Sequence, residues 1–139
     1  MIIPFVFDDG GRKDSIYANT EKLDCGVRAL AIALNLPYAK AHTMLKNWGR
    51  KDRHKTYKMD EFVKTVLMNK FPNRIIVHEN INITLSKFVN QYYRGIFMLY
   101  RNGHFFAVKD GVVYDTFSQG GKSKIRWFVE IKPESTPII

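Results

Sequence analysis

The sequence predicts a single α+β domain in which helices come first and an antiparallel sheet follows. The alanine-rich segment from Cys25 to Asn35 is apolar on nearly every side, as expected of a buried helix. The dipeptides Asn102-Gly103 and Asp110-Gly111 separate alternating apolar segments, which is typical of antiparallel hairpins. The 139 residues are 45% hydrophobic and 14% aromatic, so one core of ordinary domain size can form.

The first half of the chain should be helical after a short arm. Residues 2–7 form a strand or an extended arm, and Asp8 to Gly11 end it with turn residues. Pro37 suits the first turn of a second helix, and Gly49 suits its end. Apolar residues then recur at helical spacing after a basic loop. The expected helices of this half span residues 25–35, 38–48 and 58–70.

The second half should be mostly β. Its expected elements are strands at residues 74–78, 96–101, 104–109, 112–115 and 125–131, and a helix at 84–93. Thr84 or Asn82 can cap that helix. The single domain would have its core at about residues 17–131, between an N-terminal arm at 1–16 and a loose tail at 132–139. The order of helices before strands predicts helices packed on one sheet.

Cys25 is the only cysteine, and it begins the alanine-rich helix. A thiol in the first turn lies among backbone N–H groups that lack intrahelical acceptors, at the positive end of the helix dipole. That environment lowers the pKa of a thiol and favours the reactive thiolate. Asp24 adds a negative charge that works against this shift, unless it serves only as the N-cap. The alternative is that Cys25 is a small buried hydrophobic residue.

The two turn dipeptides make the placement of His104 and Asp115 predictable. If Asp110-Gly111 is a two-residue turn, Asp115 lies opposite Phe106 and on the face that carries His104. The Cα atoms of His104 and Asp115 are then roughly 7–8 Å apart, a gap that side chains can close. A carboxylate there would orient the imidazole as a base for the thiol. A register slip of one residue would separate the two and leave a surface histidine and a turn-forming aspartate.

The order of these residues resembles the papain-like cysteine peptidase superfamily. In that superfamily a cysteine begins the central helix, a Gly-His pair begins a strand, and Asp or Asn follows one strand later; here these are Cys25, Gly103-His104 and Asp115. The minimal bacteriocin-processing peptidases and small phage and prophage proteins are similar, and the resemblance covers about residues 17–117. It implies a papain-like fold and a Cys-His-Asp triad that hydrolyses a peptide or isopeptide bond of a peptide or protein substrate. The superfamily places an oxyanion-stabilising glutamine before the cysteine, whereas this chain has Asn19 six positions upstream.

The same residues leave other functions open. An amine or thiol acceptor in place of water would make the enzyme an acyl or amide transferase. A papain-like scaffold with a silent site would instead be a binding protein for an acidic host protein or for nucleic acid. The net charge of +9 suits either partner. Because basic loops are usually only solvated, nucleic acid is the less favoured partner. The candidate contact residues are Arg50, Lys51, Arg53 and Lys55.

The sequence predicts no cofactor and no metal. His42, His54 and His78 have no metal-ligand spacing with one another or with Cys25. The sequence contains no glycine-rich phosphate loop and no apolar stretch of about 18 residues that would span a membrane. A single cysteine cannot form an internal disulfide, so a reducing, cytoplasmic location is expected, in the host cell if the chain is phage-encoded. The sequence does not indicate an oligomeric state.

Overall fold

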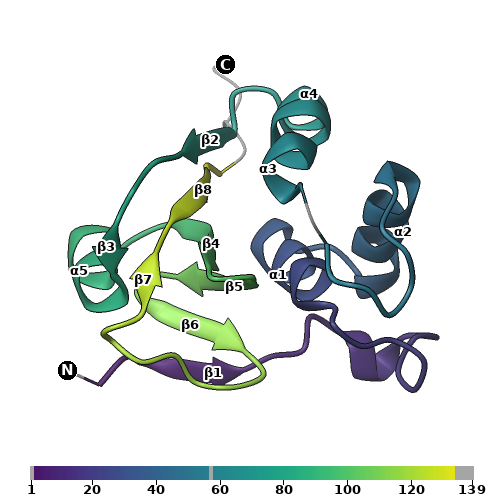
Figure 1. Ribbon diagram of the computed structural model, residues 1–139, viewed down its shortest axis with the longest axis horizontal. Helices are drawn as coiled ribbons and strands as arrows, with labels where there is room; N and C mark the ends of the chain where they lie inside the picture. The colour runs from purple at the N-terminus through teal and green to yellow at the C-terminus, as the bar shows by residue number, and fades with distance from the viewer. Residues whose placement is uncertain (1, 57, 134–139) are drawn as a thin grey trace, which may run out of the picture.

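A six-stranded sheet separates two apolar clusters, and helices cover both of its faces (Figure 1). The computed structural model describes residues 2–56 and 58–133. The strands lie in the order β1-β6-β5-β4-β8-β2. They are β1 (Phe5–Phe7), β2 (Ile75–His78), β4 (Ile96–Arg101), β5 (His104–Lys109), β6 (Val112–Asp115) and β8 (Trp127–Ile131). A second sheet pairs β3 (Ile83–Thr84) with β7 (Lys124–Ile125).

The predicted helices begin and end close to the expected positions, although the one expected at 58–70 is divided into three elements and the 3₁₀ turn at 12–14 was not predicted. They are η1 (Arg12–Asp14), α1 (Cys25–Leu34), α2 (Tyr38–Trp48), α3 (Met59–Phe62), the π-helical η2 (Val63–Leu67), α4 (Met68–Lys70) and α5 (Leu85–Gln91). α1 ends where Asn35 adopts a left-handed φ of 53°, and α2 ends at Gly49 with a φ of 125°. The hydroxyl of Thr84 caps α5 by accepting the N–H of Lys87. Within the described residues, every helix is too short or too polar to cross a membrane.

The sheet is mixed, so the prediction of a wholly antiparallel sheet was wrong at one edge. β1 pairs in parallel with β6, which places Phe7 beside Asp115. The expected arm at 1–16 therefore contributes an edge strand. Local sequence patterns could not predict this pairing, because β1 and β6 are far apart in the chain. The strand expected at 125–131 is also divided, since β7 pairs with β3 whereas β8 pairs with β2 and β4.

The hairpins that join β4, β5 and β6 have the predicted turns and register. Both turn dipeptides, Asn102-Gly103 and Asp110-Gly111, have positive φ at both positions, as a type I′ turn requires. The pairs between β5 and β6 are Lys109 with Val112, Val108 with Val113, and Ala107 with Tyr114. Because side chains alternate along a strand, this register directs His104 and Asp115 toward the same face. The hairpins thus bring two candidate site residues to one end of the sheet.

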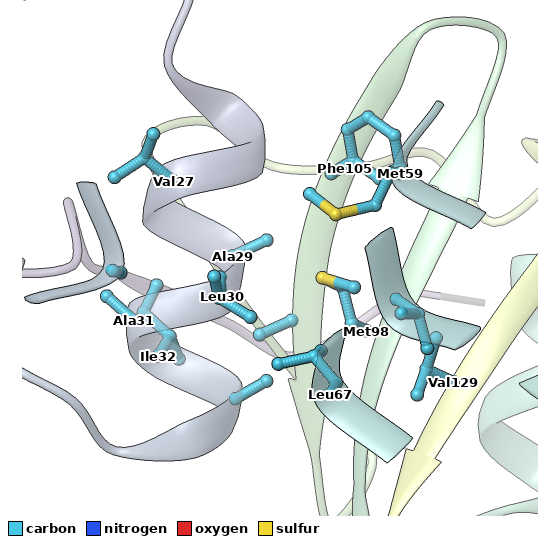
Figure 2. Close-up of a cluster of buried hydrophobic side chains, with 14 of the residues drawn as sticks. Val27, Ala29, Leu30, Ala31, Ile32, Met59, Leu67, Met98, Phe105 and Val129 are labelled. Atoms are coloured by element: carbon cyan, nitrogen blue, oxygen red, sulfur yellow. The ribbon is translucent and has the colours of Figure 1, made fainter. Parts of the chain in front are cut away.

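α1 lies between α2 and the sheet, where small side chains allow a close approach. Ala29 and Leu30 face Met98 and Val129 of the sheet in the cluster drawn in Figure 2. On the opposite face, the ring of Phe88 on α5 packs against apolar side chains of β4 and β8. Burial of each large apolar side chain contributes roughly 1.5–3 kcal/mol, so both clusters fix the sheet firmly. The start of α1 is thereby held beside the end of the sheet.

Candidate active site

Cys25 lies where the first turn of α1 meets the turn between β4 and β5. Its Sγ atom is 4.0 Å from the carbonyl oxygen of Gly103, and the residue is only 7% exposed. Gly26, the residue after Cys25, allows the first turn of α1 to pack closely against Thr56 and Met59. A Cβ at Gly26 would lie 2.7 Å from the hydroxyl of Thr56 and 3.0 Å from Met59. The first turn of α1 therefore lies between Thr56 and Met59 on one side and the hairpin turn at Gly103 on the other.

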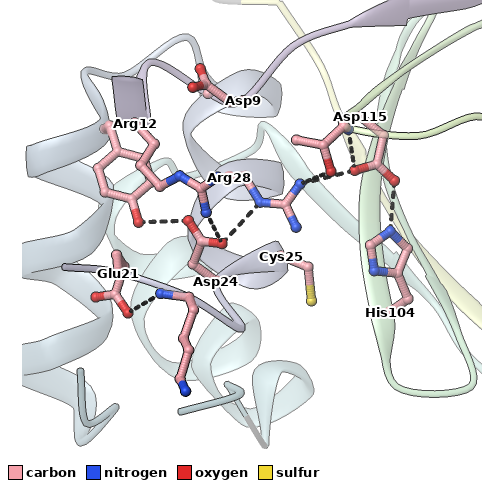
Figure 3. A network of polar contacts seen from close by, with 12 residues as sticks. Asp9, Arg12, Glu21, Asp24, Cys25, Arg28, His104 and Asp115 are labelled. Atoms are coloured by element: carbon pink, nitrogen blue, oxygen red, sulfur yellow. Dashed lines mark hydrogen bonds and ion pairs between the residues drawn. The ribbon is translucent and has the colours of Figure 1, made fainter. Parts of the chain in front are cut away.

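His104 and Asp115 form a direct contact, as the register argument predicted. Nε2 of His104 donates to Oδ2 of Asp115 over 2.6 Å. The other ring nitrogen, Nδ1, lies on the side of Cys25 in Figure 3. Phe117 packs against the imidazole with a centroid distance of 4.8 Å, which shields the ring from water on that side. The structure thus brings all three residues of the predicted Cys-His-Asp set into one site.

The side chain of Asp115 accepts hydrogen bonds from donors that sequence reasoning missed. The residue is 2% exposed, and its Oδ1 accepts from Arg28 Nη1 at 3.1 Å. The side-chain amide of Gln119 donates to Oδ2 at 3.1 Å, and the backbone N–H of Thr116 donates to Oδ1 at 2.7 Å. One signal was available in the sequence: an arginine in an otherwise apolar buried helix requires a buried partner. Nothing local identified that partner as Asp115.

Asp24 occupies the N-cap position of α1, but its side chain makes no capping hydrogen bond. Its carboxylate instead accepts from Arg12 Nη1 at 3.0 Å, Arg28 Nε at 3.1 Å and the Tyr38 hydroxyl at 2.8 Å. Arg28 therefore bridges the two buried carboxylates of the site (Figure 3). The negative charge expected to oppose thiol ionisation is compensated by these donors.

The surroundings of Cys25 and His104 favour a thiolate beside an imidazolium. Burial raises the pKa of the Cys25 thiol, but the hydrogen bond and charge of His104, the N–H of Phe105 and the charge of Arg28 outweigh it and lower that pKa. Burial lowers the pKa of His104, but hydrogen bonds and negative charge from Asp115 and Cys25 raise it to about 9. The lowered pKa of Cys25 and the raised pKa of His104 both favour transfer of the proton from the sulfur to the imidazole.

A cavity of about 310 Å³ opens beside the thiol. Asn19, predicted to assist an oxyanion, is exposed in a turn and does not line this cavity, so that prediction is not supported by the geometry. The backbone N–H of Cys25, a residue that lines the cavity, is the better candidate donor, because the first N–H groups of α1 have no intrahelical acceptor. The cavity is lined by Arg12, Lys22, Leu23, Asp24, Cys25, Arg28, Lys55, Asn102, Gly103, His104, Thr116 and Phe117.

The predicted basic contact residues do not form one exposed set. Arg50 is only 6% exposed, and its guanidinium donates to both carboxylate oxygens of Glu21, at 3.1 and 2.9 Å. It is therefore unavailable to a partner, which corrects the prediction for this residue. Sequence reasoning missed Glu21, because nothing in the local pattern marks it as buried. Lys51, Arg53 and Lys55 are exposed.

Glu21, His42 and Asp52 offer ligand atoms within 4.8 Å of one another, which the spacing of the histidines did not predict. Nε2 of His42 lies 2.7 Å from Glu21 and 3.1 Å from Asp52. Arg50 already balances the charge of Glu21, and a guanidinium in contact with the carboxylate disfavours a metal cation there. We interpret this group as an ion-pair cluster.

Comparison of the chain with protein-family models, with curated proteins and with solved structures gives no match. The fold is α+β with a mixed sheet. Its candidate site contains a thiol in the first turn of a buried helix and a hydrogen-bonded His-Asp pair at the end of the sheet. Proposals about chemistry therefore come from this geometry.

Proposed function

We propose that this protein is a papain-like thiol hydrolase that cleaves a peptide or isopeptide bond. Cys25 is the nucleophile, His104 is the acid and base, and Asp115 orients His104. The observation that carries the proposal is the 2.6 Å contact between Nε2 of His104 and Oδ2 of Asp115, which leaves Nδ1 on the side of the thiol. A nucleophile, a base and an orienting carboxylate in this order are what acyl transfer through a thioester requires.

In the first half of the reaction, the Cys25 thiolate attacks the carbonyl carbon of the scissile amide and forms a C–S bond. The electron pair of the carbonyl moves to oxygen, where the backbone N–H of Cys25 stabilises it at the positive end of α1. When this oxyanion collapses, the C–N bond breaks. The Nδ1–H of His104 protonates the departing amine, which leaves a thioester on Cys25 and a neutral imidazole.

In the second half, neutral His104 removes a proton from water, and the water oxygen attacks the thioester carbon. Collapse of the second oxyanion breaks the C–S bond, releases a carboxylic acid and restores the thiolate beside an imidazolium. Asp115 remains ionised throughout and keeps the ring in place by accepting from Nε2. An amine that replaces water in this half would give an amide transferase by the same steps.

The test measures alkylation of the folded protein by iodoacetamide between pH 5 and 9, because alkylation reports the thiolate without a known substrate. The wild-type protein should react at pH 6 nearly as fast as at pH 8. His104→Ala should react at least tenfold more slowly at pH 6, because only the N–H of Phe105 and the charge of Arg28 then oppose the effect of burial, which raises the thiol pKa. His54→Ala is the matched control, since that histidine is exposed in the loop and should leave the profile unchanged.

An ordinary thiol ionisation near 8.5 that His104→Ala does not alter would overturn the proposal and favour a binding protein. A reactive Cys25 allows the second measurement, which is mass spectrometry of a peptide library after incubation with the protein. Cleaved products should form with the wild-type protein and be absent with Cys25→Ala. Alkylation without cleavage of any peptide, but with formation of amide-linked adducts to an added amine, would assign the transferase instead.

A further inference from the structure

The cavity beside Cys25 has a strongly basic lining, which neither the triad nor its orienting groups require. Besides Cys25 and His104, its ionisable lining residues are Arg12, Lys22, Arg28, Lys55 and a single carboxylate, that of Asp24. Arg12 and Arg28 both donate to Asp24, and Arg28 also donates to Asp115. These two arginines are therefore compensated by carboxylates of the site. The two lysines account for the remaining positive charge.

Lys22 and Lys55 are exposed, and neither forms an ion pair with the residues that the structure describes. The Lys55 ammonium lies 3.8 Å from the position that a Cβ at Gly103 would occupy. Gly103 is also the residue whose carbonyl oxygen lies 4.0 Å from the Cys25 sulfur. Lys22 and Lys55 thus both line the cavity in which a substrate carbonyl must approach the thiol, and the Lys55 ammonium lies beside the hairpin turn next to it.

The protein holds the segments that carry these lysines in fixed positions. Thr56, next to Lys55, is buried and packs against the N-terminal turn of α1 at Gly26. The carboxylate of Glu21 accepts the backbone N–H of Lys22 at 3.2 Å and that of Arg53 at 2.6 Å. One buried carboxylate therefore joins the backbone at Lys22 to the loop that leads to Lys55. The basic lining belongs to the packed structure of the site.

We propose that Lys22 and Lys55 select an acidic peptide, in which a carboxylate lies next to the bond that Cys25 attacks. This inference rests on the proposed function, since it assigns the substrate class of the same site. An acidic side chain bound near both lysines would be attracted by two positive charges in a partly enclosed cavity. Nucleic acid fits the site less well, because it offers phosphate charge but no acyl carbonyl for the thiolate.

The first experiment compares two alkylating agents that differ in charge. Iodoacetamide is neutral, whereas iodoacetate carries a carboxylate, so the ratio of their rates at Cys25 reports the potential in the cavity. In the double variant Lys22→Gln, Lys55→Gln, the iodoacetate rate should fall about fivefold while the iodoacetamide rate changes less than twofold. The matched control is Lys46→Gln, Lys87→Gln, which removes the same charge from exposed positions on α2 and α5.

The second experiment tests the substrate class by protection of the thiol from iodoacetamide. A hexaglutamate peptide should slow alkylation at least fivefold, and hexaglutamine should not. The protection by hexaglutamate should disappear in the double lysine variant and persist in its control. Equal protection by both peptides, or protection by a single-stranded DNA decamer without protection by hexaglutamate, would overturn the acidic-peptide inference.

The two proposals fail in different ways. If the pH profile of iodoacetamide alkylation shows an ordinary thiol pKa for Cys25, the hydrolase proposal is wrong, regardless of the result with the lysine variants. If the thiol is activated but the ratio of the two alkylation rates is the same in the double variant and its control, the hydrolase proposal stands. The assignment of an acidic substrate would then be overturned.

Discussion

The protein contains two histidine–carboxylate pairs of nearly the same length, one fully buried and one only partly buried. His42 and Glu21 are 2.7 Å apart, and His104 and Asp115 are 2.6 Å apart. His42 has no exposed surface, stacks on Tyr17 at 3.8 Å, and its Nδ1 has no hydrogen-bond partner. The second nitrogen of His104 instead lies beside a thiol at an open cavity. The two pairs therefore differ in what the second ring nitrogen faces, which is the feature on which the proposed chemistry of His104 depends.

The carboxylates of the two pairs also have different partners. Glu21 binds the guanidinium of Arg50 through both oxygens and the backbone of Arg53, and these contacts fasten one loop to another. Asp115 accepts a hydrogen bond from Arg28. Arg28 also donates to Asp24, the residue at the N-cap of the cysteine helix. One cluster stabilises a loop, whereas the other fixes the relative position of the thiol and the imidazole.

The largest expected effect comes from Glu21→Gln. This change leaves the buried guanidinium of Arg50 without its charged partner, and breaking a buried ion pair from one side costs about 3–5 kcal/mol. Urea unfolding should show this loss of stability. The control is Glu79→Gln, whose ion pair with Lys64 is exposed and screened by solvent and should contribute little to stability. A loss no larger than in the control would show that the Glu21 contacts do not hold the fold together.

Asp115→Asn tests the other pair through the ionisation of His104. The amide can keep a hydrogen bond to the ring but removes the negative charge, so the pKa of His104 should fall from about 9 to below 7. NMR titration of the imidazole nitrogens measures this change. The matched control is Glu130→Gln, which removes the carboxylate 3.6 Å from His78 and should leave His104 unchanged. An imidazole pKa that stays near 9 in Asp115→Asn would refute the assigned role of Asp115.

Short-range chemistry made one part of this site predictable from the sequence. Asn-Gly and Asp-Gly turns fix the hairpin register, and the register then determines which side chains share a face. The contact between His104 and Asp115 follows from this register and from the alternation of side chains along each strand. The placement of Cys25 follows from helix periodicity and from the tendency of a hairpin turn to lie at the end of a sheet.

The partners of buried charges were not predictable in the same way. Arg28, Gln119 and Glu21 find their partners through contacts between segments that are far apart in the chain, and no local pattern specifies such a choice. The parallel pairing of β1 with β6 depends on the same kind of long-range packing. Asn19 was assigned by analogy with the glutamine that precedes the cysteine in papain-like peptidases, but it is exposed in a turn.

The stability contributed by the Glu21 cluster and that contributed by the Cys25–His104 pair should depend differently on pH. Hydrogen bonds and charge outweigh the effect of burial, and they lower the pKa of Glu21 from 4.5 to about 2. Its contribution is therefore complete above pH 4.5 and is lost as pH falls toward 2, by on the order of 2 kcal/mol. Urea unfolding between pH 5 and 2.5 should show this loss in the wild-type protein. The same loss in Glu21→Gln would place its origin elsewhere.

The Cys25–His104 pair should behave differently, because its two pKa values move in opposite directions. The pKa of His104 is raised from 6.5 to about 9, so this group alone would lose stabilisation as pH rises through that window. The lowered pKa of Cys25 has the opposite effect on stability: below pH 9.0, its contribution increases as pH rises. In the folded protein, a thiolate–imidazolium pair binds one proton, on the imidazole. The unfolded chain also binds one proton, on its thiol, so the free energy of unfolding of the wild-type protein should be nearly constant from pH 7 to 8.5.

In Cys25→Ala, His104 keeps its hydrogen bond to Asp115, but no thiol ionises to offset its titration. The free energy of unfolding of this variant should therefore fall by about 1 kcal/mol between pH 7 and 8.5. A wild-type slope as steep as that of the variant would mean that the sulfur is not ionised in the folded protein.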